Sequence, residues 1–231
     1  MIAGDIPFDP VRSGSRPLLP ELPDALHWVN RRERPRLADW RGQVVLMVFW
    51  NGCSVSSSNL VGEMRRLEKK LPGAFVPVCV HTPRYASQQS DAAVLKAAHR
   101  NRLRAPVAND AEWLAWKQYT ISAWPTTLLV DAHGRLAARL VGEGRSQEIE
   151  DAVMQLRDEL QHADGAPPVR APASSPDVRA EPVSPLAFPA HALATGDRLY
   201  VSDTGHHRIL ECSHDGRVLR QFGSGTPGNW D

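Results

Sequence analysis

The stretch VVLMVFWNGCSVSSSNLVGEMRRLEKKL, residues 44–71, decides the fold. Its first seven residues form a continuous run of β-branched and apolar side chains, which is typical of a buried central strand. Leucine and methionine then recur at helical spacing, so the pattern predicts an amphipathic helix over 54–71. A buried strand followed directly by an amphipathic helix favours an α/β fold.

Strand and helix signals continue to alternate after this stretch. FVPVCVH, residues 75–81, predicts a second buried strand, in which Pro77 indicates a bulge or an edge position. A helix is expected over 90–100, and 126–142 predicts a β-hairpin of two apolar strands around a His-Gly turn. Apolar residues at helical spacing between 149 and 160 predict a final amphipathic helix.

Composition divides the chain into four parts. Residues 1–22 are rich in Pro, Arg and Ser and are expected to be a flexible leader. The first domain is predicted over 23–162, and the Pro- and Ala-rich stretch 163–185 is expected to be a linker because it has little apolar area to bury. Residues 186–231 carry three short strand candidates separated by TGH and HDG turns, which predict a β-meander.

The overall charge and the cysteines limit the function classes. The net charge is +1, so no strong field attracts nucleic acid or an anionic membrane. The three cysteines, Cys53, Cys79 and Cys212, form no CxxC pair, which argues against a disulfide framework and fits a reducing compartment. No signal-peptide pattern and no run of ~18 apolar residues is present. We therefore expect a cytoplasmic protein that binds neither nucleic acid nor membrane.

The order of elements and two motifs resemble the thioredoxin family. Phe49-Trp50 ends the central strand before the helix, and Trp124-Pro125-Thr126 matches the family's X-Pro-Thr motif ahead of the hairpin. The resemblance covers about 24–161 and implies a thioredoxin-like fold, with a mixed central sheet flanked by helices and a cis bond before Pro125. It also implies a groove around Trp50, Trp124, Pro125 and Thr126 that binds a protein partner.

The same resemblance implies a redox motif that this chain has lost. In the family, the first redox cysteine follows the Trp by four residues, at a helix N-terminus that stabilises its thiolate. The second cysteine follows three residues later. Counted from Trp50, these places hold Ser54 and Ser57, which form no disulfide, and Val48 stands where the family carries a buried acid. The favoured interpretation is a redox-inactive binding or scaffold module in which both serines serve as helix caps.

Cys53 keeps a second interpretation open. A one-residue shift of the alignment would make Cys53-Ser54-Val55-Ser56 a monothiol CxxS site. Cys53 would then be the catalytic residue of a thiol-disulfide oxidoreductase or antioxidant protein. A purely structural remnant is the third hypothesis, so enzymatic activity is left open. His81, at the end of the second strand, is a minor catalytic candidate.

The stretch LYVSDTGHHRILECSHDGRVLRQFGSG, residues 199–225, resembles an NHL repeat, the unit of one class of β-propeller. The resemblance implies that Asp203 and Arg208 hold the turn of a blade by hydrogen bonding. Four potential ligands match no zinc spacing, so neither metal nor cofactor is expected: His206, His207, Cys212 and His214. A propeller needs several blades, so this is expected to be a partial propeller in a fragment or truncated product. The order of a thioredoxin-like domain, a linker and an NHL repeat resembles the family of NHL-repeat-containing proteins that carry a thioredoxin-like domain.

Overall fold

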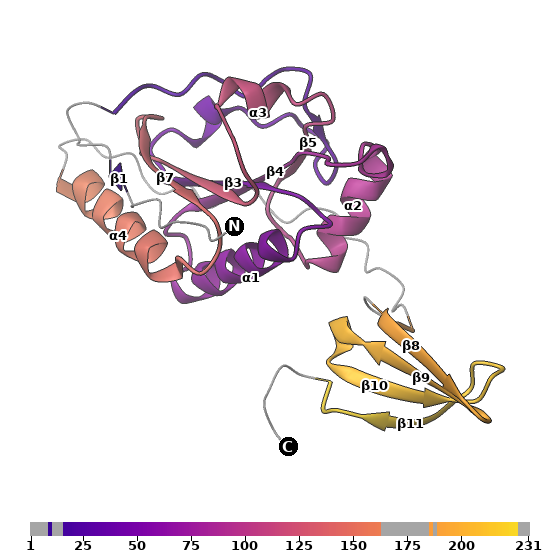
Figure 1. The fold of residues 1–231 in the computed structure, drawn as a ribbon. Helices are drawn as coiled ribbons and strands as arrows, with labels where there is room; N and C mark the ends of the chain where they lie inside the picture. The colour runs from indigo at the N-terminus through magenta and orange to yellow at the C-terminus, as the bar shows by residue number, and fades with distance from the viewer. Residues whose placement is uncertain (1–8, 11–15, 163–184, 187–188, 226–231) are drawn as a thin grey trace. The chain divides into compact units, whose positions relative to one another are not determined.

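The computed structural model of the 231-residue chain describes residues 9–10, 16–162, 185–186 and 189–225. The chain divides into two compact units. The described part of the first unit ends at His162, and that of the second begins at Pro185 (Figure 1). Apart from Pro185, the predicted linker 163–185 lies outside the described residues, and the four predicted boundaries stay predictions.

The first unit is built on a seven-stranded sheet in the order β1-β7-β6-β3-β4-β5-β2. β3 pairs in parallel with β4 and antiparallel with β6, so the predicted mixed central sheet is confirmed. The strands are Asp9–Pro10 (β1), His27–Trp28 (β2), Val45–Trp50 (β3), Val76–His81 (β4), Val107–Asn109 (β5), Thr126–Val130 (β6) and Leu136–Val141 (β7).

Helices cover both faces of this sheet (Figure 1). One face packs against α1 (Val55–Lys70), α2 (Asp91–Arg100) and α4 (Ser146–His162). The other face is covered by α3 (Leu114–Gln118) and the 3-10 helix η2 (Leu37–Trp40); a second 3-10 helix, η3, spans Ala86–Gln88. The predicted helices over 54–71 and 90–100 and the terminal helix are thus confirmed.

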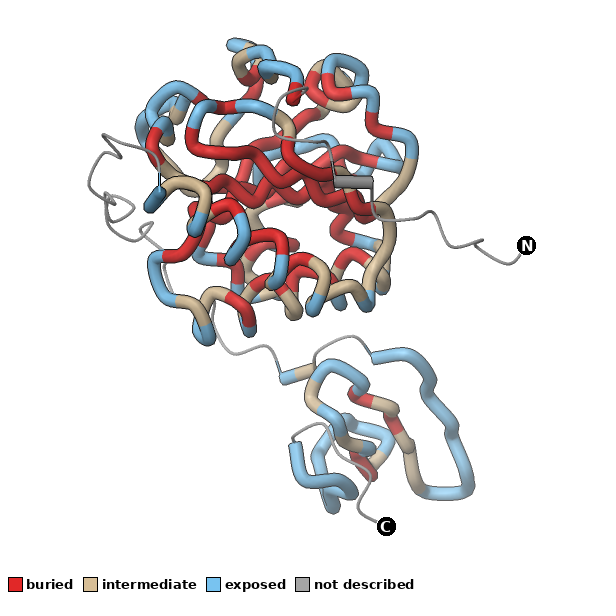
Figure 2. The backbone as a smooth tube through the Cα atoms, turned by 90° about the vertical axis from the view of Figure 1, so that its left-hand side faces the viewer, coloured by how far each residue is buried: buried red, intermediate tan, exposed pale blue. Residues whose placement is uncertain are grey.

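Strand β3 contributes side chains to the hydrophobic core on both faces of the sheet. Its side chains alternate between the layer under α1 and the layer under α3, and all six residues are buried. Figure 2 shows the buried strands running through the centre of the unit. Burial on both faces explains why the sequence of β3 is a continuous apolar run rather than an alternating one.

Pro77 sits in β4 without a bulge, so that part of the prediction is wrong. It pairs in regular register with Leu46 of β3. The amide of Cys79 donates to the carbonyl of Pro106 on the β5 side, and alternation turns the nitrogen of Pro77 to the same side. β5 begins only at Val107, so the missing N–H of Pro77 falls where no strand lies alongside.

Part of the predicted flexible leader is tied to the first unit, and the prediction is wrong for these residues. Asp9–Pro10 pair with β7. The guanidinium of Arg16 lies 2.6 Å from the carboxylate of Glu159, and Leu22 is buried in the core. These partners lie far along the chain, so local composition did not reveal them. Residues 1–8 and 11–15 lie outside the described ranges.

The second unit contains a four-stranded antiparallel sheet in the order β11-β10-β9-β8. Three of its strands were predicted, whereas β8 was missed because its sequence, PAHALAT, begins with proline and is rich in alanine. The strands are Pro189–Thr195 (β8), Arg198–Asp203 (β9), Arg208–Cys212 (β10) and Val218–Phe222 (β11), with the 3-10 helix η4 at Thr204–His206.

Candidate functional site

The two thioredoxin-like motifs meet at one end of the first sheet. β3 and β6 are antiparallel, and Phe49 of β3 pairs with Thr126 of β6. The residues that follow Phe49 therefore lie beside Trp124 and Pro125, which precede Thr126. The peptide bond between Trp124 and Pro125 is cis.

Trp50 does not line an open groove, which corrects the predicted groove of Trp50, Trp124, Pro125 and Thr126. The pleat of β3 turns Trp50 into the layer under α1, where its side chain is 0% exposed. Its ring meets that of His81 edge-on, with 5.2 Å between the centroids. Pro125 and Thr126 are also buried, and only Trp124 reaches the surface, half-buried.

Three tryptophans instead gather beside the cis-proline. Trp124 lies 5.4 Å from Trp113 and 4.6 Å from Trp116, and the latter two are 5.0 Å apart, measured between ring centroids. We call Trp113, Trp116 and Trp124 the tryptophan cluster; each is half-buried. The Asp110 carboxylate accepts from the amides of Ala115 and Trp116, so it anchors the start of α3, which carries Trp116 and directly follows Trp113. Burial raises the pKa of Asp110.

The tryptophan cluster was not foreseen from the sequence. Trp113 and Trp116 lie three residues apart in the sequence, but Trp124 belongs to the proline motif and reaches them only through the fold. The available signal was composition, since seven tryptophans is a high number for a chain of 231 residues.

Ser54 and Ser57 hold the start of α1. The Ser54 hydroxyl accepts from the amide of Ser57 at 3.2 Å, which is an N-cap hydrogen bond. The buried hydroxyl of Ser57 accepts from the amide of Asn51 at 3.1 Å. Ser54 thus stands four residues after Trp50 at the helix start, and Ser57 one turn further on. This geometry supports the gapless alignment that puts both serines in the cysteine places.

The loop between β3 and α1 is fixed by a buried amide pair that the sequence did not reveal. The Asn51 side-chain oxygen accepts from the Cys53 amide at 3.0 Å and from the Gln88 side chain at 3.1 Å. Its nitrogen donates to the Thr82 carbonyl at 2.9 Å. Asn51 and Gln88 are both buried, so the loop backbone is held from inside the protein.

Cys53 is exposed and unpaired. The preceding Gly52 packs on α2, since a Cβ there would lie 2.7 Å from the Cβ of Ala97, and its carbonyl accepts from Arg100 at 3.0 Å. Cys79 is buried in an apolar layer, which raises the pKa of its thiol. Within the described part of this unit, Cys53 therefore has no second accessible thiol with which to form a disulfide.

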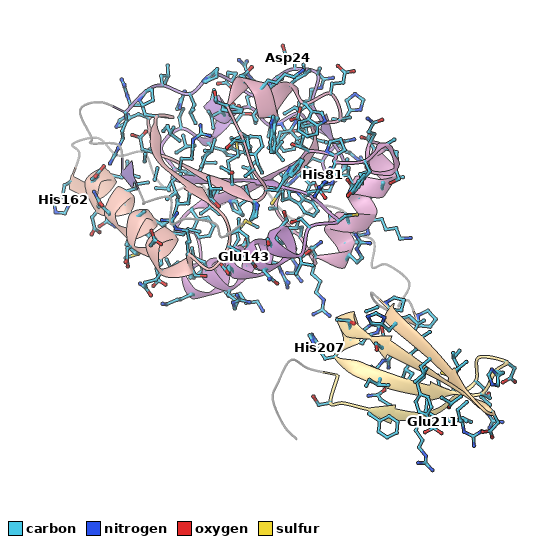
Figure 3. The ribbon with its side chains drawn as sticks, in the orientation of Figure 1. Asp24, His81, Glu143, His162, His207 and Glu211 are labelled. Carbon is cyan, nitrogen blue, oxygen red and sulfur yellow. The ribbon has the colours of Figure 1, made fainter. Side chains whose placement is uncertain are left out.

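His81 lies inside the unit (Figure 3). Its side chain is 1% exposed, and burial lowers its pKa to about 4, so the imidazole is neutral at pH 7. Three buried nitrogens at this end of the sheet have no hydrogen-bond partner among the described residues: Nδ1 of His81 and Nε1 of Trp50 and Trp124. A neutral, enclosed imidazole is poorly placed to exchange protons with a substrate at the surface.

No group of three or more His, Cys, Asp or Glu side chains among the residues with assigned positions could hold a metal ion. None of the helices in those same ranges is long and apolar enough to span a bilayer.

In the second unit, Asp203 and Arg208 form a contact across the turn between β9 and β10. The fully buried Asp203 carboxylate accepts from Arg208 Nε at 2.7 Å and lies 2.8 Å from His206 Nδ1. Arg208 also donates to the Pro185 carbonyl at 2.8 Å. The motif residues therefore make structural contacts rather than a metal site.

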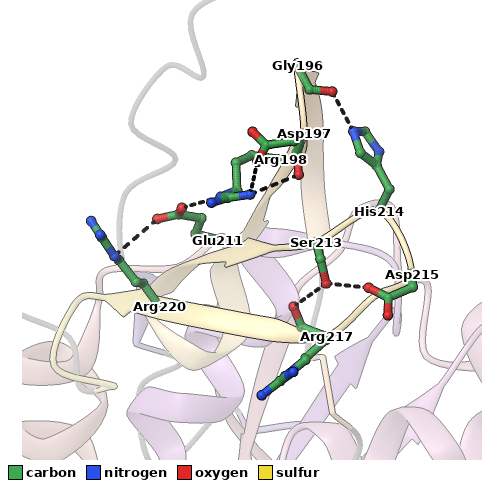
Figure 4. Close-up of polar contacts among 9 residues, drawn as sticks. All are labelled: Gly196, Asp197, Arg198, Glu211, Ser213, His214, Asp215, Arg217 and Arg220. Atoms are coloured by element: carbon green, nitrogen blue, oxygen red, sulfur yellow. Dashed lines mark hydrogen bonds and ion pairs between the residues drawn. The ribbon is translucent and has the colours of Figure 1, made fainter.

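A second set of polar contacts ties the far ends of the same strands (Figure 4). The buried Glu211 carboxylate lies 3.0 Å from Arg198 and 3.8 Å from Arg220. The His214 ring lies 2.9 Å from the Gly196 carbonyl oxygen, and Ser213 donates to Asp215. The Glu211 contacts link β9, β10 and β11 through their side chains.

Comparison with known proteins agrees with this geometry. Residues 42–136 match the family model described as thioredoxin-like. The chain is 28% identical over 221 residues to NHL repeat-containing protein 2 of Bos taurus, covering 93% of this chain and 30% of the relative. It is 30% identical over 213 residues to Protein SUPPRESSOR OF QUENCHING 1, chloroplastic, of Arabidopsis thaliana, covering 89% of this chain and 20% of the relative. The chain thus spans less than a third of either relative.

Solved structures support the fold of the first unit. A secreted thiol-disulfide isomerase from Corynebacterium glutamicum matches with a TM-score of 0.57 and 18% identity, over 68% of this chain and 96% of that one. A putative thiol:disulfide interchange protein DsbE from Chlorobium tepidum matches with a TM-score of 0.54 and 18% identity, over 61% and 96%. The first unit is a thioredoxin-like domain, in a chain homologous over most of its length to NHL repeat-containing protein 2.

Proposed function

We propose that the thioredoxin-like domain is a redox-inactive module that binds a protein partner. The observation that carries the proposal is the role of the two serines. Ser54 and Ser57 stand at the start of α1, and their hydroxyls are used to cap the helix and to hold the preceding loop. A serine hydroxyl is not acidic near neutral pH and forms no disulfide, so the domain keeps the fold without dithiol chemistry.

The proposed partner-binding surface is the tryptophan cluster with the adjoining loop. Trp124 lies beside the residues that follow β3, and this loop presents the exposed Cys53. The next residue but one, Val55, is 75% exposed at the first turn of α1. Half-buried tryptophans supply large contact area and dominate the energy of many protein interfaces. This surface replaces the groove predicted around Trp50.

We propose further that the second unit is a blade of an NHL-type β-propeller. Its four antiparallel strands, its Asp203–Arg208 contact and the homology to NHL repeat-containing protein 2 support this assignment. Every residue of β8 and β11 is exposed, so the sheet leaves its outer strands uncovered, as a single blade would. The cytoplasmic location stays a prediction from the cysteine content.

A disulfide-reduction assay tests the redox part of the proposal. Insulin reduction by dithiothreitol would be followed with three proteins: the natural chain, Cys53→Ser, and Ser54→Cys/Ser57→Cys. We expect the first two to stay at the uncatalysed rate and the double variant to gain activity, because it restores a dithiol at a helix N-terminus. Activity of the natural chain that Cys53→Ser abolishes would establish the alternative, a monothiol oxidoreductase acting through exposed Cys53.

A second experiment tests the partner-binding part. Photo-crosslinking from a probe placed at Val55 should capture a protein from cell lysate, and capture should survive Cys53→Ser but fall after Trp124→Ala. Capture that depends on Cys53 alone, or that is unaffected by loss of the tryptophan, would contradict the proposed surface.

A further inference from the structure

Three arginine-rich segments meet at the end of the first sheet opposite the candidate site. α1 ends just before β4 begins, and the turn after α2 leads into the start of β5. β2 is antiparallel to β5, so the residues after Trp28 run past that same start. Asn30 fixes this arrangement, since its side chain donates to the Ala105 carbonyl and accepts from the Val107 amide, both at 2.8 Å.

Each segment brings two arginines to this end of the sheet. Four of the six side chains are exposed and two are half-buried. We call the set the basic patch: Arg31, Arg32, Arg65, Arg66, Arg102 and Arg104.

The charges of the basic patch are poorly compensated. Burial, together with the nearby charges of Arg102 and Arg104, lowers the pKa of Arg65. Glu68 is the acid that faces them, and burial raises its pKa. Apart from Arg31, no patch side chain makes a hydrogen bond or an ion pair to the described residues. Several positive charges are therefore held together with little internal neutralisation.

Other arginines of the same domain are used differently. Arg16 pairs with Glu159, Arg145 pairs with the neighbouring Glu148, and Arg139 donates to the backbone carbonyl of Tyr119. Glu159 and Glu148 thus neutralise arginines elsewhere in the domain, whereas the basic patch keeps a repulsion that an external anion would relieve.

We propose that the basic patch is a docking surface for an acidic protein segment, rich in Asp and Glu. Guanidinium groups bind carboxylates in bidentate geometry, and several exposed arginines on one surface favour the approach of a negatively charged partner. The patch lies at the opposite end of the sheet from the tryptophan cluster, so a partner could occupy it independently of the proposed function.

Two features favour an acidic peptide over a nucleic acid. The three segments, RRERPR, RRLEKK and NRLR, contain no aromatic side chain on which a base could stack. Glu33 and Glu68 interrupt the positive surface, and a continuous phosphate backbone would meet these carboxylates. Discrete side-chain carboxylates on a flexible peptide can avoid them.

The test is fluorescence anisotropy on the full chain with a labelled oligoglutamate peptide. An oligothymidylate of equal charge and an oligoglutamine peptide are the comparison probes. The main variant is Arg102→Gln/Arg104→Gln, and Arg66→Gln is an independent one on another segment. Arg84→Gln/Lys117→Gln is the matched control, because it removes two exposed positive charges outside the patch.

We expect the oligoglutamate to bind in a salt-dependent manner and the oligoglutamine not to bind. The patch double variant should weaken binding by at least about fivefold, whereas the control should change it less than about twofold. Absence of oligoglutamate binding, equal losses in the patch and control variants, or tighter binding of the oligothymidylate would each overturn the proposal. Circular dichroism of every variant confirms that the exposed substitutions leave the fold intact.

Discussion

Replacement of Ser57 by alanine should destabilise the thioredoxin-like domain by about 1–3 kcal/mol. The Ser57 hydroxyl is fully buried and accepts from the amide of Asn51, which is 2% exposed. Alanine removes only the oxygen, so the change in packing is small, and the main effect is a buried N–H left without an acceptor. The amide of residue 57 still donates to the Ser54 hydroxyl, so the variant isolates the role of the Ser57 side chain.

Urea unfolding followed by tryptophan fluorescence is the appropriate assay, because six of the seven tryptophans precede residue 163. A loss of about 2 kcal/mol would lower the midpoint by roughly 1 M. Ser56→Ala is the matched control in the same helical turn: Ser56 is half-buried, and its hydroxyl makes no hydrogen bond to a described residue. We expect that control to stay within about 0.5 kcal/mol. Equal effects of the two substitutions would refute the structural role assigned to Ser57.

Three further perturbations follow from the geometry. Gly52→Ala should destabilise the domain by about 1–3 kcal/mol, since its Cβ would lie 2.7 Å from that of Ala97, and added Ala97→Gly should restore much of the loss in urea unfolding; no rescue would refute the contact. Burial lowers the pKa of His81 from 6.5 to about 4, so the unfolded chain binds the extra proton between these values. Stability should therefore fall by up to about 3 kcal/mol as pH drops from 6.5 to 4, and a His81→Leu variant with the same pH slope would contradict this. Asp203→Ala removes a buried carboxylate and should make the second unit protease-sensitive, whereas exposed Asp215→Ala should not; equal digestion would count against the turn contact.

The local sequence pattern was sufficient to predict strands that are buried along a continuous apolar run and helices that bury one apolar face. β3 and α1 are such elements, because continuous burial and helical periodicity leave direct marks in the sequence. The helix-capping role of Ser54 was predictable for the same reason. The tethering of Arg16 was not, because its partners lie more than a hundred residues away along the chain.

The site was harder to predict than the fold. The motif around Trp50 marked the correct end of the sheet, but whether its ring faces solvent depends on the pleat of β3 and on His81. The tryptophan cluster and the Asn51–Gln88 pair join residues from separate elements, so no local spacing reveals them. Strand β8 was missed because its residues have low strand propensity and are held by pairing with β9, which no local pattern reveals.

Pro77 has a consequence for how the chain reaches a single strand alignment. β5 is three residues long, and sliding it by two residues toward the start of β4 would preserve which side chains face each layer. That alternative alignment would require a donor at position 77, where proline has none. The native alignment instead uses the amide of Cys79. Pro77 thus disfavours the shifted alignment of β5 along β4. A residue that weakens most sheets here makes the pairing of a short strand more specific.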